Sequence, residues 1–179
     1  MERKINVLKD IVIPTVTLLI ICVVVTAALA ATNWLTQKQM AEKEFEKKKE
    51  SLEKVIAAGD YKEQEIEHDG QKIKYYEAID GELKGYIFET SASGYGGAVS
   101  VMTGIQPDGK IAAVVILDAS KETKGIGDRI TNPAYLEQYK GQSGQVDEGA
   151  NTITGATFSS KAVIKAVNSA LELFDKVKG

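Results

Sequence analysis

Residues 98–117 read Ala-Val-Ser-Val-Met-Thr-Gly-Ile-Gln-Pro-Asp-Gly-Lys-Ile-Ala-Ala-Val-Val-Ile-Leu, and this stretch decides the fold. Two runs rich in β-branched residues flank Pro107-Asp108-Gly109, where proline fixes φ and glycine accepts a positive φ. The pattern predicts an antiparallel hairpin of strands 98–105 and 110–117. The second run lacks an alternation of apolar and polar residues, which predicts a strand buried on both faces.

More strands are predicted on the N-terminal side of this hairpin. Lys72–Ala78 and Lys84–Ser91 have the composition of strands and flank an Asp80-Gly81 turn. A glycine cluster, Gly94-Tyr95-Gly96-Gly97, then separates the second of these strands from strand 98–105.

Helices are predicted on the C-terminal side, after a polar loop at 120–128. Asn132-Pro133 starts a short helix through Tyr139, and a longer helix is capped by Ser159 or Ser160 and runs to about residue 177. Apolar residues of the longer helix are spaced by four and three, so one face packs inward; they are Val163, Val167, Ala170, Phe174 and Val177. The order predicts an α+β domain with an antiparallel sheet flanked by helices.

An uncharged run, Ile11–Ala31, precedes the domain. Its length of about 20 residues suits a helix that crosses a bilayer, which predicts a membrane helix over 11–33 after a short segment at 1–10. The alternative is a secretory signal peptide cleaved near Ala31, but such peptides usually have a shorter apolar core. Lysines flank the run on both sides, so the charges leave its orientation open.

A charged segment at 34–59 follows the predicted anchor. Glutamate and lysine at helical spacing predict a helical stalk, and Gly59 ends it. Leu52, Val55 and Ile56 are its densest apolar positions, so we expect the last turns to pack on a domain that spans 60–179.

The composition excludes several classes of function. The net charge of −3 offers no basic surface for nucleic acid. Cys22 is the only cysteine and lies in the apolar run, so this chain alone cannot build a disulfide, a zinc site or an iron–sulfur cluster from cysteines. His68 is the only histidine and lies in a predicted turn, and no hydrolytic triad can be drawn around it.

Small and hydroxyl-bearing residues crowd Thr154-Gly155-Ala156-Thr157, at the start of the last predicted helix. Free amides at a helix N-terminus favour a phosphate, and Gly155 and Ala156 let another molecule approach the backbone. The Thr157 hydroxyl could hydrogen-bond a phosphate or be esterified by one. By itself, the segment is better explained as a loop that leads into an ordinary helix capped by serine.

The same four residues resemble the Ser/Thr-Gly-Ala-Thr motif of the FMN-binding domain in the G subunit of the Rnf ion-translocating electron-transport complex. The C subunit of the Na⁺-translocating NADH:quinone reductase is related. Further similarities are the glycine cluster, the Asp108-Gly109-Lys110-Ile111 hairpin and the loop Glu122-Thr123-Lys124-Gly125-Ile126-Gly127. The resemblance covers nearly the whole chain, and the motifs occur in the family's order.

The resemblance implies an electron-carrying subunit of a ferredoxin:NAD oxidoreductase coupled to Na⁺ or H⁺ translocation, which is not a catalyst on its own. It implies FMN joined by a phosphoester to Thr157 and installed by a flavin transferase that uses FAD. It also implies other membrane subunits as partners, a single-pass chain in the cell (inner) membrane, a cytoplasmic N-terminus and an extracytoplasmic C-terminal domain.

Residues of three motifs are expected around the flavin. They are Thr157, Thr154, Gly155, Ala156, Ser159 and Ser160 in the attachment segment, Glu122 and Thr123 in the loop, and Tyr95, Gly96 and Gly97 in the glycine cluster. We expect the glycines to admit a flat ring, Tyr95 to stack on it, and the loop to hydrogen-bond it.

The sequence departs from the family at two positions. Lys124 stands where the family usually has proline, and Asn151 stands where it commonly has an aspartate that the transferase reads. Two alternatives remain open: the C subunit of the quinone reductase, whose chains are usually longer, and a membrane-anchored docking module that has lost its flavin.

Overall fold

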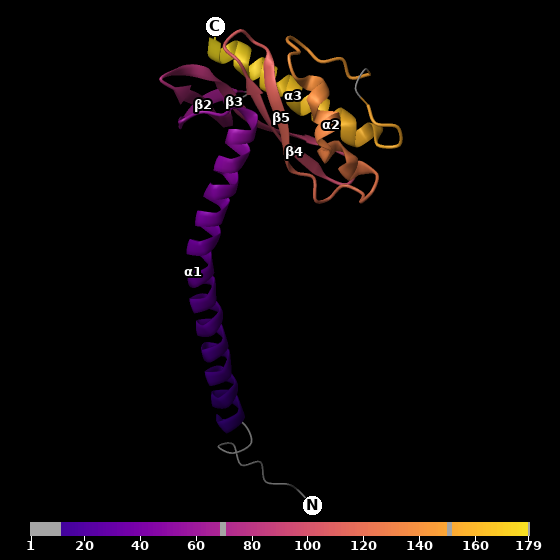
Figure 1. Cartoon of the computed structure of the whole chain (residues 1–179). Coiled ribbons are helices and arrows are strands. Elements are labelled where there is room, and N and C mark those ends of the chain that lie inside the picture. Colours follow the sequence, from indigo (N-terminus) through magenta and orange to yellow (C-terminus); the bar gives the residue numbers. More distant parts are fainter. Residues whose placement is uncertain (1–11, 69–70, 150–151, 179) are drawn as a thin grey trace, which may run out of the picture. The chain divides into compact units, whose positions relative to one another are not determined.

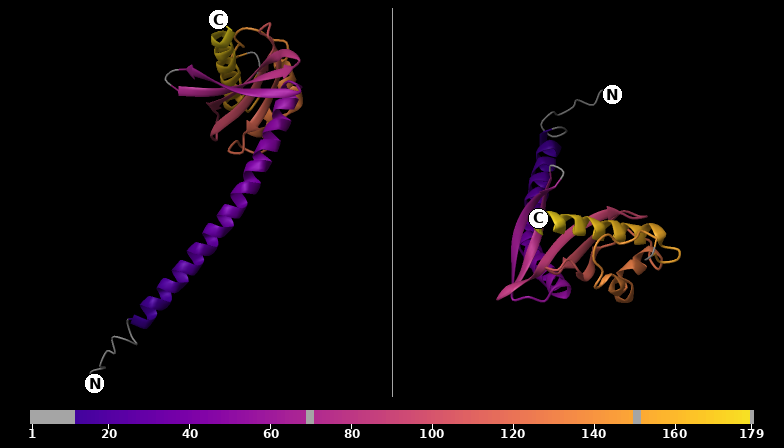
Figure 2. Two further views of the ribbon diagram at one scale, coloured as in Figure 1. Left: turned by 90° about the vertical axis from the view of Figure 1, so that its left-hand side faces the viewer. Right: turned by 90° about the horizontal axis from the view of Figure 1, so that it is seen from above.

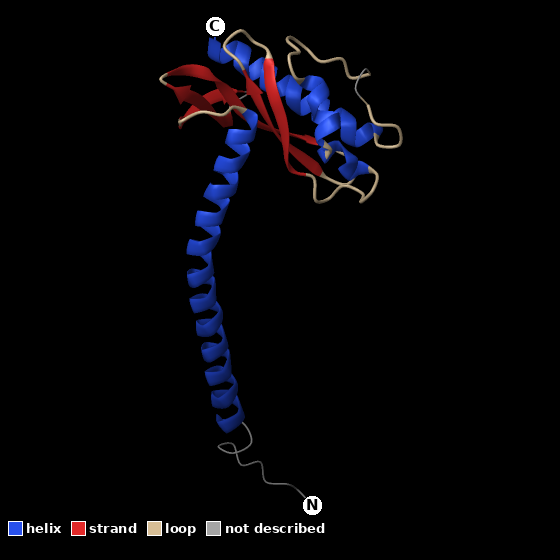
Figure 3. Ribbon diagram, in the orientation of Figure 1, coloured by secondary structure: helices blue, strands red, loops and turns tan. Residues whose placement is uncertain are grey.

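The computed structural model describes residues 12–68, 71–149 and 152–178, which exclude the predicted cytoplasmic segment and Asn151. The chain divides into two compact units after Lys47. Helices and strands follow in this order (Figures 1 and 3): α1 (Ile13–Val55), β1 (Asp60–His68), β2 (Gln71–Asp80), β3 (Glu82–Ser93), β4 (Ala98–Ile105), β5 (Ile111–Asp118), η2 (Gly127–Thr131), α2 (Pro133–Leu136), η3 (Glu137–Tyr139) and α3 (Thr157–Lys178).

The first unit contains most of α1, which runs through the predicted anchor and stalk as far as Val55. The predicted end of the stalk at Gly59 is therefore wrong by four residues. Within this first unit, the described large apolar side chains are exposed, including Leu18, Leu19 and Leu29. Within the part of the chain that the structure describes, no helix combines the length and the apolarity that spanning a bilayer requires.

The sheet of the second unit is an antiparallel meander with the strand order β1-β2-β3-β4-β5. Both predicted glycine turns are confirmed, because Gly81 has a φ of 74° and Gly109 a φ of 89°. The strand β1 escaped prediction. Its sequence has few apolar residues, and it pairs with β2 in a regular register in which Ile66 lies opposite Ile73.

The prediction that the last strand is buried on both faces is confirmed only in part, because both faces contact a core but one of them, with Ala112, Val115 and Leu117, is half-buried. In β5 only Ile111 and Val114 are buried, and the remaining apolar residues are half-buried. The physical reason is its place at the edge of the sheet, where one side of the strand has no neighbouring strand.

Helices cover both faces of the sheet. The helix α3 packs on β3 and β4 (Figures 1 and 2). Phe88, Val101 and Ile164 are buried in the core that these elements share. On the other face Leu52 and Val55, from the last turns of α1, pack with sheet residues such as Ile87 and Met102. The prediction that the end of the stalk joins the domain is thus confirmed, and neighbouring residues of β3 serve opposite cores.

The apolar stripe of α3 is confirmed, and its predicted start is wrong. The stripe residues Val163, Val167, Ala170 and Phe174 are buried, and Val177 is half-buried. The helix begins at Thr157, two or three residues before the predicted caps. Ser159 and Ser160 lie in its first turn and are buried, because their hydroxyls bond to other segments of the domain.

The predicted short helix at 133–139 is confirmed as α2 followed by η3. Asn132 caps it, since its side-chain oxygen accepts a hydrogen bond from the Ala134 amide at 3.0 Å. Pro133 occupies the first helical position, where a missing N–H costs little.

Candidate cofactor site

The chain turns sharply into α3. Gly155 adopts a φ of 86°, and the Ala156 amide donates to the Ile153 carbonyl at 2.9 Å. The first helical hydrogen bond runs from the Ser160 amide to the Ala156 carbonyl. The three amides between these residues, from 157 to 159, therefore have no acceptor within the helix, which makes this end suited to an anion.

Glu122 joins the three motifs that the sequence singled out. Its side chain is only 5% exposed. One carboxylate oxygen accepts from the Gly96 amide at 3.0 Å, and the other accepts from the Ser159 hydroxyl at 2.5 Å. The glycine cluster, the 122–127 loop and the first turn of α3 are thus held together by one carboxylate.

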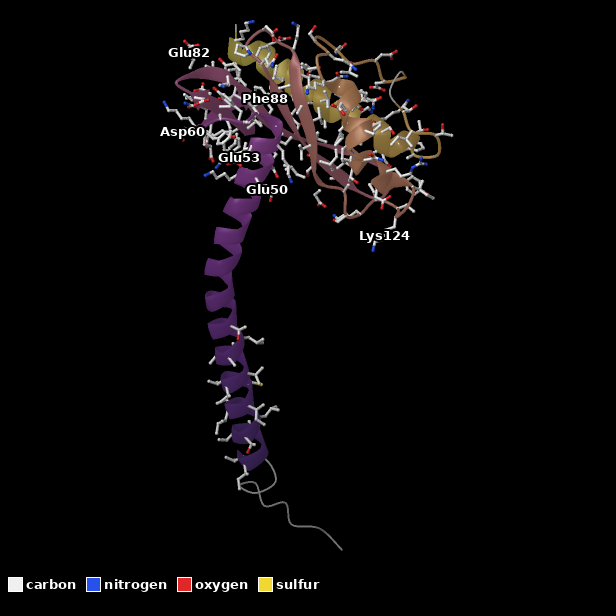
Figure 4. All side chains as sticks on the ribbon, viewed as in Figure 1. Glu50, Glu53, Asp60, Glu82, Phe88 and Lys124 are labelled. Carbon is white, nitrogen blue, oxygen red and sulfur yellow. The ribbon has the colours of Figure 1, made fainter. Side chains whose placement is uncertain are left out.

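The 122–127 loop is built around the Thr123 carbonyl, which accepts from the Ile126 amide at 3.1 Å and from the Gly127 amide at 2.8 Å. Gly125 supplies a positive φ of 77°. A Cβ at Gly127 would lie 2.6 Å from the Glu122 carboxylate, so only glycine fits at this position. Lys124 is exposed on this loop (Figure 4).

The glycines at 96 and 97 lie against the protein's own backbone, not against the cavity. A Cβ at Gly96 would overlap the Lys121 carbonyl, and one at Gly97 would meet the Lys121 side chain at 2.6 Å. The expectation that these two glycines admit a flat ring is therefore replaced by a packing role: they let the glycine cluster approach the 121–122 segment.

A cavity of about 390 Å³ opens where the three motifs meet. Its lining residues are Tyr95, Glu122, Thr123, Ile126, Gly127, Gly155, Ala156, Thr157, Phe158 and Ser159. Of the residues expected around a flavin, Thr154, Ser160, Gly96 and Gly97 do not line it. The cavity has the size typical of small-molecule sites.

Three lining residues were missed by the sequence reasoning: Ile126, Gly127 and Phe158. Phe158 is 67% exposed and Ile126 is 49% exposed, while Tyr95 is 74% exposed. The rings of Tyr95 and Phe158 have their centroids 6.3 Å apart and are tilted by 46°. The sequence could have indicated two of them, because Ile126 and Phe158 are apolar residues that belong to no stripe that packs inward.

Ser160 does not line the cavity, and its side chain instead holds the segment that leads into α3. Its hydroxyl accepts from the Ile153 amide at 3.0 Å. Beneath it, the hydroxyls of Tyr135 and Tyr139 are 2.8 Å apart. Burial raises the pKa of Tyr139 well above its usual range, and burial likewise raises the pKa of Tyr135, so both phenols are neutral.

Among the described residues, no group of three or more histidine, cysteine, aspartate or glutamate side chains could hold a metal ion.

Comparison with known proteins agrees with the geometry. A model of the FMN-binding domain family matches residues 94–172, a range that contains every residue of the cavity. The G subunit of the ion-translocating oxidoreductase complex of Methanosarcina acetivorans is 30% identical over 96% of this chain and 98% of its own. The chain belongs to the G-subunit family of ion-translocating oxidoreductase complexes.

Other members of the G-subunit family show the same relation. The G subunit of the Na⁺-translocating ferredoxin:NAD⁺ oxidoreductase complex of Acetobacterium woodii is 30% identical, with 89% of each chain covered. The G subunit of the proton-translocating complex of Clostridium ljungdahlii is 28% identical, with 88% of each covered. The crystal structure of Shewanella oneidensis NqrC shares the fold, with a TM-score of 0.52 at 21% identity over 65% of this chain and 69% of that one.

Proposed function

We propose that this member of the G-subunit family carries FMN joined through a phosphoester to Thr157 and relays electrons within a membrane complex. One observation carries the proposal: Thr157, exposed at the first residue of α3, lines a cavity that the three motifs form together. A phosphate on this hydroxyl would lie beside the free amides of the first helical turn, which favour negative charge.

The attachment reaction is a phosphoryl transfer. The Thr157 oxygen forms a bond to the phosphorus on the riboflavin side of FAD, the bond to the AMP phosphate breaks, and the threonine hydroxyl loses its proton. AMP leaves and FMN stays on the chain. The donor is FAD and the catalyst is a flavin transferase, and neither redox change nor a metal held by this chain is needed.

The lining suits a flavin ring. Tyr95, Phe158 and Ile126 offer apolar surface at the rim, and aromatic rings favour stacked or tilted contacts with a planar ring. Thr123 and the buried Glu122 supply polar groups at the cavity wall. FMN contributes the electron transfer, while these side chains bind it and limit its movement.

The complex is proposed from the relatives. Their names describe subunits of ferredoxin:NAD⁺ oxidoreductases that translocate Na⁺ in one organism and protons in another. We propose the same role here, with other membrane subunits as partners and no catalysis by this chain alone. The match to G subunits over nearly the whole chain favours this role over that of the C subunit of the quinone reductase.

The location is part of the proposal. An anchor at 11–33, with the N-terminus in the cytoplasm and the domain outside, is supported by the uncharged run Ile11–Ala31 and by the family's membrane complexes. This support comes from the sequence and the relatives, since the described helix itself does not meet the requirement for spanning.

In-gel flavin fluorescence after denaturation tests the attachment. The full chain is coexpressed with a flavin transferase beside Thr157→Ala and, as a matched control, Thr152→Ala, an exposed hydroxyl outside the four-residue motif. We expect fluorescence from the native sequence and from Thr152→Ala, and none from Thr157→Ala. Equal fluorescence from all three would move the attachment elsewhere. A dark native chain, beside a competent control protein, would favour the docking module without flavin.

A further inference from the structure

The two edges of the sheet differ in charge. Along the edge strand β1, charged side chains are frequent: Asp60, Lys62, Glu63, Glu65 and Glu67. The other edge strand, β5, has no charged residue from Ile111 to Leu117. Natural proteins protect exposed edges with charges, so the β1 edge is built to face water and the β5 edge is built to be covered.

A groove of about 500 Å³ runs along the uncharged edge. Ala112–Ile116 of β5 form one wall, and Pro133, Leu136 and Glu137 from α2 and η3 form the other. Ala112, Ala113, Val115 and Ile116 are half-buried here, so further apolar burial is available. The groove is separate from the cavity beside Thr157, with which it shares no lining residue.

The chain itself pairs with only the start of this edge. The Ile111 amide donates to the Gln142 carbonyl at 2.8 Å, and the Ile111 carbonyl accepts from the Gly141 amide at 2.8 Å. Lys110 and Ser143 form an antiparallel bridge. These contacts are those of a sixth strand. In this antiparallel register, the residues before Gly141 would pair with Ala112–Ile116, but they form η3 and α2 instead, so no strand of the described residues continues along this part of the edge. The groove lies where that sixth strand would continue.

We infer that this groove binds an extended segment of a neighbouring subunit, which adds to the sheet beside β5. Backbone hydrogen bonds would supply affinity, and small or β-branched apolar side chains would suit the walls. Lysines that line the groove also favour a particular charge on the partner. Lys54 is already paired with Glu50 at 2.8 Å, while Lys140 is in no ion pair among the described residues, so an acidic side chain of the partner would meet Lys140.

A neighbouring subunit is a better occupant than a second copy of this chain. In a second copy, β5 is flanked by the same α2 and η3, so pairing two β5 edges would have to accommodate both sets of helices. A free extended segment has no such helices. The inference rests on the proposed membership of a complex, because that supplies the partner.

Photo-crosslinking in the purified assembled complex tests the occupant. A photoreactive residue replaces Glu137 on the groove wall, and a matched one replaces Glu65 on the charged edge; both positions are exposed. We expect position 137 to crosslink to an extended, acidic segment of another subunit, and position 65 not to. Crosslinks to a second copy of this chain, or none from position 137, would overturn the inference.

Hydrogen exchange gives an independent reading that needs no substitution. We expect amides at 112–116 to exchange more slowly in the complex than in the isolated full chain, and equal rates would contradict the inference. Lys140→Glu should weaken association about fivefold at low salt, while Lys62→Glu should not. Flavin content distinguishes the two proposals: it is unchanged in Lys140→Glu, and its absence from the native chain would challenge the flavin site alone.

Discussion

Glu122 joins the glycine cluster, the 122–127 loop and the first turn of α3, so its removal should loosen all three segments. In Glu122→Ala, the Gly96 amide and the Ser159 hydroxyl both lose their acceptor in a buried place. Leaving such groups unsatisfied costs roughly 1–3 kcal/mol, and we expect a loss of that size in urea unfolding. The control is Glu172→Ala on the exposed side of α3, which should change the free energy of unfolding by less than about 0.5 kcal/mol.

Gly96 tests the packing role of the glycine cluster. A methyl group there would overlap the Lys121 carbonyl, which is backbone and cannot move away cheaply. Gly96→Ala should therefore destabilise the domain by about 1–3 kcal/mol and lower flavin attachment, because the Glu122 contact shifts with the backbone. Gly149→Ala is the matched control, because the atom nearest to its added Cβ would be a carboxylate oxygen of Asp147 at 3.6 Å, an ordinary contact distance. Equal midpoints of urea unfolding for both variants would contradict the packing role.

At the scale of elements, the buried phenols below the attachment segment make stability depend on pH. The pKa of Tyr139 is raised in the folded state, so the stabilisation is complete below the ordinary tyrosine pKa of about 10 and is lost as the pH rises above it. We expect the free energy of unfolding to fall between about pH 9 and 11. Tyr139→Phe should show a smaller fall, and Tyr95→Phe, at an exposed position, should match the native chain.

Most elements could be predicted from their composition or spacing. Four strands are runs of β-branched and aromatic residues bounded by turn residues, and α3 has an inward apolar stripe. The strand β1 has few apolar residues, because pairing with β2 holds it in the sheet while most of its side chains are exposed. The start of α3 was misplaced because Ser159 and Ser160 have the chemistry of caps but use their hydroxyls for tertiary contacts.

The site was predicted by motif more than by residue. The sequence indicated which three segments matter, and the structure brings all three to one cavity. However, a motif does not show which neighbours each of its residues contacts. Whether Gly96 lies against a ligand or against Lys121, and whether the Ser160 hydroxyl lines the cavity or bonds Ile153, depends on contacts that the motifs do not encode.

For the whole molecule, the division after Lys47 predicts a separable domain. A fragment of residues 48–179 keeps the last turns of α1, whose Leu52, Val55 and Ile56 are buried in the second core. We expect it to unfold cooperatively and to accept flavin from a purified transferase. The full chain should sediment with membranes and the fragment should not. A fragment beginning at residue 60 serves as the control and should be less stable, since one face of its sheet is uncovered.

The order of the strands also affects the rate of folding. Each strand pairs with the next along the chain, so the meander can assemble through short loops, whereas α3 must return over a long separation, as in the Thr90 to Ala166 hydrogen bond across 76 positions. Closing long loops is the slow part of reaching a native state. Thr157, the proposed attachment residue, is the first residue of α3. We expect α3 to dock after the meander has formed, so flavin at Thr157 would mark chains that have completed this step.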